Sequence, residues 1–207
     1  MLNRIVFKGV KINMKSNFIV TAVLCLLLLM TACSPAESAT SKQDYSLDAN
    51  TGIADVDAVL SAAASGNAAE LRSLVRYTSA PCTNADGLGG PPKCRVGEAE
   101  GAVSSVLPFL GGEGSFIREE EITSWAGVDA VGLYAIYRVA EKATMEEYYP
   151  RGNYAVVLKT SSGEAVSLRV ADGGIVRVDY LFLVTQDSLE ALVEQDASEV
   201  ILAPKVE

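Results

Sequence analysis

The chain has 207 residues, 26 of them acidic and 17 basic, so its formal net charge is −9, and it contains no histidine. Such an acidic chain is poorly suited to binding nucleic acid or an anionic membrane surface, because both need clusters of Lys and Arg. The lack of histidine excludes the Ser-His-Asp and Cys-His pairs that activate many nucleophiles.

Residues 1–32 have the layout of a secretory signal. Four basic residues precede an apolar run at residues 18–30, which is 13 residues long. Since a helix needs about 20 apolar residues to cross a bilayer, this run is too short to be a membrane span. Translation from Met14 is an alternative, because Lys15 would still precede the apolar run. All 26 acidic residues and 13 of the 17 basic ones follow the segment, so the remaining chain carries a net charge of −13.

Residues 29–33, Leu-Met-Thr-Ala-Cys, resemble the bacterial lipobox. The resemblance implies that the chain is cut before Cys33 and that lipid on Cys33 anchors it in a membrane of the cell envelope. Ser34 follows the cysteine, which in a bacterium with two membranes would direct the protein to the outer one. The alternative is an ordinary signal peptide that leaves Cys33 as a free thiol.

The part after the signal divides by composition. Residues 34–50 are polar and small, so residues 33–50 are interpreted as a lipidated cysteine followed by a flexible tether. Residues 51–207 are long enough for one extracytoplasmic domain.

Two short helices are predicted at the start of this domain. Apolar residues recur at helical spacing over residues 53–63 and predict a helix that ends at Gly66. Asn67 is a predicted N-cap, with Glu70 three residues on, of a second helix whose apolar face comes from residues 71–75. We expect the pair to form a helical hairpin that covers a sheet.

Cys82 and Cys94 form an even pair after the signal and the lipidated cysteine are set aside. In an oxidising compartment we expect a disulfide between them, worth about 3 kcal/mol in the chain-entropy model. A metal site is the weaker alternative, because two thiolates need two further ligands. The Gly- and Pro-rich residues 78–101 are predicted to be a loop, and residues 102–110 a short helical turn. Residues 119–121, three consecutive Glu, are interpreted as a solvated helix start rather than a Ca²⁺ site.

The second half of the chain is predicted to form strands, a short helix and an edge strand. The predicted strands are residues 131–139, 154–160, 166–170 and 175–183. Tight turns at residues 161–163 and 172–174 join the last three as hairpins. The last of the four is apolar on both faces and is predicted to be central in the sheet. Residues 188–194 are the predicted helix, and residues 200–203 the edge strand.

The helical pair with Ser-Gly-Asn-Ala-Ala-Glu-Leu at residues 65–71, followed by strands that end in Asp-Gly-Gly-Ile-Val-Arg-Val-Asp-Tyr-Leu at residues 172–181, resembles the NTF2-like (SnoaL-like, cystatin-like cone) superfamily. The resemblance implies an α+β fold in which an N-terminal helical hairpin packs on a curved, mainly antiparallel sheet. Residues 82–101 also resemble a segment of uncharacterised bacterial lipoproteins, which implies no known activity.

In cones of this kind, acidic residues and tyrosines inside the cone can act as acid–base groups. The resemblance therefore points to a pocket formed by one carboxylate and several tyrosines, namely Asp179, Tyr134, Tyr137, Tyr154 and Tyr180. The alternative is that these amphipathic aromatic residues fill core and rim positions.

Three functions are compatible with these features. The first is a membrane-anchored binding module that meets another envelope protein or a small ligand. The second is an isomerase- or hydratase-type enzyme that uses Asp179 in a closed pocket. The third is a structural envelope component. The sequence contains no catalytic motif, so it predicts no catalytic residue, and it predicts no cofactor, no metal and no nucleic-acid partner. Of the three functions, we favour the binding module.

Overall fold

The computed structural model describes residues 46–87, 90–111, 114–143, 147–182 and 185–203. By internal contacts the chain divides into residues 1–40 and residues 41–207, and the described residues all belong to the second unit. The predicted signal and Cys33 lie outside the described residues. Among these residues, no helix combines the length and the apolar character that a membrane crossing requires.

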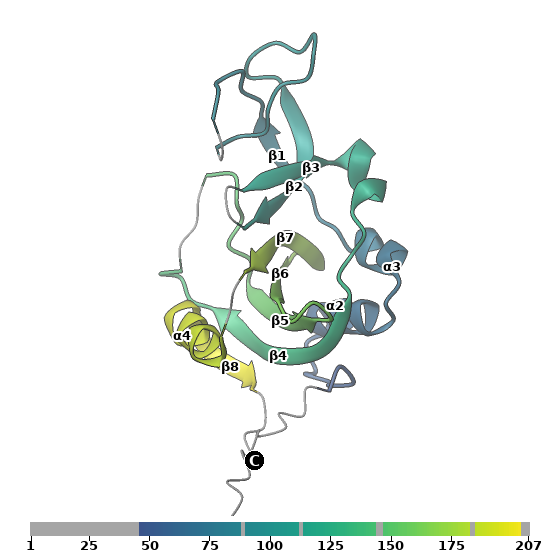
Figure 1. Ribbon diagram of the computed structural model, residues 1–207, viewed down its shortest axis with the longest axis vertical. Helices are drawn as coiled ribbons and strands as arrows, with labels where there is room; N and C mark the ends of the chain where they lie inside the picture. The colour runs from purple at the N-terminus through teal and green to yellow at the C-terminus, as the bar shows by residue number, and fades with distance from the viewer. Residues whose placement is uncertain (1–45, 88–89, 112–113, 144–146, 183–184, 204–207) are drawn as a thin grey trace, which may run out of the picture. The chain divides into compact units, whose positions relative to one another are not determined.

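The second unit is an α+β domain built on one mixed sheet of eight strands (Figure 1). Seven strands follow the order β1-β2-β7-β6-β5-β4-β8, and β3 pairs with β2. All pairs are antiparallel except that between β2 and β7. The strands are β1 (Thr78–Pro81), β2 (Val103–Leu110), β3 (Ser115–Arg118), β4 (Ala130–Val139), β5 (Tyr154–Thr160), β6 (Ala165–Ala171), β7 (Gly174–Leu181) and β8 (Ala197–Leu202).

Four helical segments accompany the sheet: α2 (Ala54–Ala64), α3 (Ala68–Ser73), the 3₁₀ helix η1 (Glu119–Ser124) and α4 (Gln186–Asp196). The predicted cap at Asn67 is present, because its side chain accepts a hydrogen bond from the backbone N–H of Ala69 at 3.0 Å. The same side chain donates to Glu70 at 3.0 Å. At α4, Thr185 and Ser188 form a reciprocal capping box, and the helix begins at Gln186, two residues before the predicted start.

Each face of the sheet has its own apolar core. The larger core lies between the sheet and α2, α3 and η1, and includes Val59, Leu71 and Trp125. The smaller core lies on the side of α4, where Leu189 meets Tyr134 and Tyr137. Figure 1 shows α4 and α2 at different sides of the curved strand β4. The central strands are therefore buried on both faces, as predicted for the strand that became β7.

Register shifts break the simple alternation of side chains on several strands. On β7, Ile175 pairs with Val170 while Arg177 pairs with Arg169, so Val176 is an extra residue. Ile175 and Val178 consequently face the same core, although strict alternation would place them on opposite faces. Strand β4 has two shifts against β5, between Ala130 and Gly132 and between Leu133 and Ala135, and two more against β8.

Two sequence predictions about the first half of the sheet were wrong. Residues 78–101 are not entirely loop, because β1 at Thr78–Pro81 pairs with β2. Residues 102–110 form strand β2 and not a helical turn, because they are held between β1 and β3 and also pair with β7. Short apolar runs fit a helix or a strand equally well, so non-local pairing decides between them.

Candidate functional site: a buried ion cluster beneath α4

Three charged side chains lie inside the apolar strands β6 and β7, on the face that α4 covers. Arg169, Arg177 and Asp179 each expose only 4 % of their surface. Arg169 and Arg177 are cross-strand partners, and Asp179 lies two residues beyond Arg177, on the same face. Adjacent strands therefore bring these three charges together within an otherwise apolar layer.

Asp179 joins the two arginines. Its Oδ2 accepts from Nε of Arg169 at 2.8 Å and from Nη2 of Arg177 at 2.8 Å. Its Oδ1 accepts from Nε of Arg177 at 2.6 Å. Both carboxylate oxygens are thus occupied by guanidinium N–H groups. In this arrangement, Asp179 could remove a proton from a substrate only after a guanidinium had moved away.

The last residue of α4 completes the cluster. Asp196 accepts from Nη2 of Arg169 at 2.6 Å, and 13 % of its side chain is exposed. Two arginines and two aspartates therefore balance in charge. A carboxylate at the C-terminus of a helix is disfavoured by the helix dipole, and its ion pair with Arg169 offsets that cost.

Tyr137 of β4 lies beside Arg169 and has no solvent exposure. The guanidinium of Arg169 lies 5.9 Å from the centre of its ring, and the small Ala155 between their strands leaves room for the ring. Burial raises the pKa of Tyr137 to about 12, so its phenol is neutral at physiological pH. Burial alone would lower the pKa of Arg169, but Tyr137, Asp179 and Asp196 outweigh burial and raise it.

Three polar groups on this face lack a hydrogen-bond partner within the described part of the chain: Nη1 of Arg169, the hydroxyl of Tyr137 and the hydroxyl of Ser167. Ser167 pairs with Asp179 across β6 and β7. A buried polar group without a partner costs about 1–3 kcal/mol. Nη1 of Arg169 can only donate a hydrogen bond, whereas the two hydroxyls can donate or accept one.

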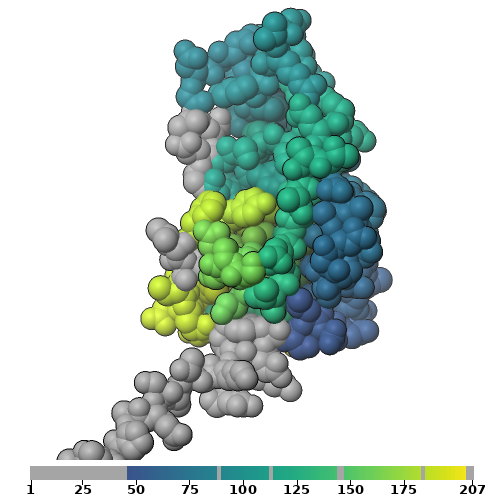
Figure 2. All heavy atoms as spheres, turned by 45° about the vertical axis from the view of Figure 1, so that its right-hand side comes forward, coloured from purple at the N-terminus to yellow at the C-terminus, as the bar shows by residue number. Residues whose placement is uncertain are grey.

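A pocket of about 240 Å³ opens next to the cluster. The four charged residues of the cluster line it. Its walls come from the end of β2 and the residue after it, from the segment before β5, from the end of β7 and from α4: Leu110, Gly111, Tyr149, Tyr180, Leu181, Leu192 and Gln195. In Figure 2, the C-terminal segment that holds α4 and β8 (yellow) lies against the green part of the chain that holds β5 and β6. The site therefore combines charged groups at its base with leucine side chains at its walls.

The predicted pocket residues lie on two different faces of the sheet. Tyr134 and Tyr137 share the α4 face with Asp179, and Gln186 of α4 donates to the hydroxyl of Tyr134 at 3.4 Å. Tyr154 packs on the larger core, where its hydroxyl accepts from Arg138 at 3.0 Å. Tyr180 borders the pocket, but its ring stacks on Phe109 of the larger core.

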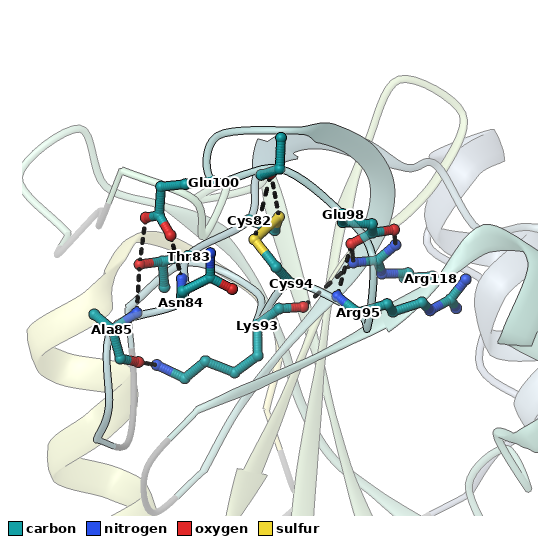
Figure 3. Close-up of a disulfide and its surroundings, with 11 residues drawn as sticks. Cys82, Thr83, Asn84, Ala85, Lys93, Cys94, Arg95, Glu98, Glu100 and Arg118 are labelled. Carbon is teal, nitrogen blue, oxygen red and sulfur yellow. Dashed lines mark hydrogen bonds and ion pairs between the residues drawn. A yellow bond between two sulfur atoms is a disulfide. The ribbon is translucent and has the colours of Figure 1, made fainter.

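The second candidate region is the loop closed by a disulfide between Cys82 and Cys94, as predicted (Figure 3). The loop is held by further bonds within it, because Thr83 accepts from the backbone N–H of Cys94 at 3.0 Å and donates from its own to Pro92 at 2.9 Å. In the described residues, Cys82, Cys94 and Glu98 form the one group of possible metal ligands. Its two sulfur atoms are bonded to each other and are therefore not thiolates.

Glu98 connects this loop to the sheet. It accepts from Arg118 of β3, at 2.7 Å to Nη2, and from the backbone N–H of Arg95 at 2.8 Å (Figure 3). These bonds, chiefly those from Arg118, lower the pKa of Glu98 to about 2.

A pocket of about 420 Å³ lies beside the loop, with Lys93, Arg95 and Arg118 in its lining. These cations already have partners within the chain. Arg95 pairs with Glu120 and Glu121, Arg118 pairs with Glu98, and Lys93 donates to the carbonyl of Ala85 at 2.9 Å. The smaller pocket beneath α4 is lined by Arg169, whose Nη1 has no partner in the described residues, and is therefore the better candidate for a binding site.

Sequence reasoning identified Asp179 but missed Arg169, Arg177 and Asp196. The signal for Arg177 and Asp179 was present, since both are charged residues within a strand that is apolar on both faces. Arg169 gave no such signal, because it alternates with apolar residues as in a half-exposed strand. Asp196 had no local signal, because its role depends on where α4 ends relative to β6.

Comparison with known proteins adds no family or neighbour. No family model, no curated protein and no solved structure matches this chain.

Proposed function

We propose that this protein is a bacterial lipoprotein, anchored in the cell envelope through lipid on Cys33, and that its extracytoplasmic domain binds a small molecule beneath α4. The lipobox-like residues 29–33 and the preceding basic and apolar segment support the anchor. An oxidising compartment also suits the disulfide between Cys82 and Cys94.

One observation carries the binding role. Nη1 of Arg169 is a buried charged donor without a partner in the described residues, and Arg169 lines a pocket of about 240 Å³. Charged groups are buried in proteins only when they are paired, so a donor left over beside a pocket is a feature of a site completed by a ligand. Since pockets for drug-sized ligands have volumes of about 300–1,000 Å³, the ligand here is a smaller molecule.

We also propose that the domain has the arrangement of the NTF2-like superfamily. In this arrangement, α2 and α3 form a helical hairpin on one face of the curved sheet. The ligand site differs from the interior of such a cone, because it lies on the opposite face, between the sheet and α4.

Native mass spectrometry of the full lipoprotein, purified from membranes and released from detergent micelles in the gas phase, tests this function. We expect a small molecule that is present under native conditions and absent after denaturation. A protein that carries only its lipid in both spectra would contradict the small-molecule site and would favour an envelope protein as the partner.

A further inference from the structure

The chemistry of the cluster indicates what kind of molecule it accepts. Among the residues that line the pocket, Arg169 has one guanidinium nitrogen, Nη1, without a partner in the described part of the chain. The acceptors of Asp179, in contrast, are already used by three guanidinium N–H groups. A complementary ligand must therefore supply an acceptor, and a charged acceptor makes the stronger hydrogen bond to a guanidinium.

The walls of the pocket are of a different character. Leu110 at the end of β2, Leu181 at the end of β7 and Leu192 of α4 surround the charged base. A ligand that is charged throughout would leave these walls without apolar contact. The pocket thus fits a molecule with one charged end and an apolar body.

The charged residues at the base of the pocket also restrict the charge of the ligand. Arg169, Arg177, Asp179 and Asp196 sum to zero, so an added anion would leave an excess of negative charge unless one aspartate withdrew. Asp196 is the one that can do so, because it contacts Arg169 through Oδ2 and its side chain is 13 % exposed, against 5 % for Asp179. In its absence, the remaining three residues carry one net positive charge.

We propose that the pocket binds a small organic acid with an apolar body, whose carboxylate bonds to Arg169 in competition with Asp196. This inference rests on the proposed small-molecule site and names its ligand class. Asp196 acts as an internal stand-in for the ligand's carboxylate, and α4, which carries Asp196 and Leu192, forms the wall that adjusts when the ligand enters.

Equilibrium dialysis with radiolabelled hexanoate tests the proposal, with hexanamide as the neutral match of the same shape. The full protein is held in lipid nanodiscs, and empty nanodiscs measure partition into lipid. We expect hexanoate to bind at least about tenfold more tightly than hexanamide, since a bond between two charged groups exceeds its neutral counterpart by more than about 1.4 kcal/mol. Equal binding of the two would overturn the carboxylate assignment.

Two variants separate ligand recognition from a merely structural role. Asp196→Asn frees Arg169 and removes a repelling charge, so hexanoate should bind more tightly, by about threefold or more, while hexanamide binding stays unchanged. Glu194→Gln is the matched control, because Glu194 is exposed on the same helix and the charge change is the same. If Asp196 were only structural, Asp196→Asn would bind hexanoate no better than Glu194→Gln, and that result would overturn the proposal.

Arg169→Lys should weaken hexanoate binding by about tenfold, because an ammonium cannot reproduce the planar fork of the guanidinium. The thermal unfolding midpoint of each variant shows whether it is folded. A bound molecule in native spectra that carries no carboxylate would refute this inference and leave the proposed function standing. If no copurified molecule is found and hexanoate does not bind, both fail.

Discussion

At the scale of single residues, Asp179 determines whether two buried guanidinium groups are tolerated. Arg169 and Arg177 both donate to it, and 5 % or less of each of the three side chains is exposed. A buried ion pair contributes little net stability compared with apolar residues, but the loss of one partner leaves an uncompensated buried charge. The cluster is therefore fragile with respect to single substitutions.

We expect Asp179→Ala to lower the free energy of unfolding by about 3–5 kcal/mol, because it removes the carboxylate that pairs with Arg177 and leaves Arg169 paired with Asp196 alone. Urea unfolding monitored by the fluorescence of Trp125 measures this, since Trp125 is the single tryptophan and is 3 % exposed in the larger core. Asp86→Ala, at an exposed loop residue, is the control and should change stability by about 0.5 kcal/mol or less. Equal losses in the two variants would show that the cluster is not a structural unit.

At the scale of elements, Glu98 ties the disulfide loop to β3. Its pKa is lowered to about 2 from an ordinary value of 4.5, so the folded protein holds the charged carboxylate more strongly than the unfolded chain does. The stabilisation is complete above pH 4.5 and is lost as the pH falls from there towards 2.

Acid should therefore loosen this link. The thermal unfolding midpoint of the Glu98→Gln variant should lie below that of the unmodified protein at pH 6, and the difference should shrink as the pH falls to 3. Calorimetry at a series of pH values measures it, with Glu194→Gln as a control whose difference from the unmodified protein should vary less with pH. A gap for Glu98→Gln that stays constant from pH 6 to pH 3 would contradict the assigned role of Glu98.

How far the sequence predicts these elements depends on whether their signals are local. The strands β4 to β7 follow from period-2 patterns and from turn residues such as Gly163 and Gly173, whose positive φ angles fit tight hairpins. Strand β2 was not predicted, because its short apolar run fits a helical turn as well as a strand, and two of its three partners, β1 and β7, are distant in the sequence. The bulge at Val176 leaves no mark in the composition of β7, so alternation alone would place Ile175 and Val178 on opposite faces.

The same limit applies to the candidate site. Asp179 and its tyrosine neighbours were proposed as one pocket, yet the sheet separates Tyr154 and the ring of Tyr180 from Tyr137. Charged residues within doubly buried strands can be recognised from sequence, since a central strand has no solvent-facing side. The distance between β6 and the end of α4, which brings Asp196 to Arg169, cannot be read from either segment alone.

At the scale of the whole molecule, two separate parts of the chain support one role. The proposed lipid on Cys33 would keep the protein at a membrane, and the acidic remainder of the chain, with its net charge of −13, would be repelled from an anionic lipid surface. Attachment would then depend on the lipid and not on charge. Three acyl chains, at about 0.8 kcal/mol per buried CH₂ group, are sufficient for stable attachment.

We therefore expect membrane attachment to depend on Cys33 alone among the cysteines. The intact mass of the protein purified from membranes of a two-membrane bacterial host should correspond to a chain that begins at Cys33 and carries lipid. Cys33→Ala should abolish both the cleavage at this position and the incorporation of labelled palmitate. Cys25→Ala, within the apolar run, is the matched control and should retain both. A protein without lipid that begins after a cleavage at another position, with Cys33 as a free thiol, would instead support an ordinary signal peptide. Membrane attachment would then no longer be part of the proposed function. The pocket beneath α4 does not depend on the lipid and would still be tested by its own ligand.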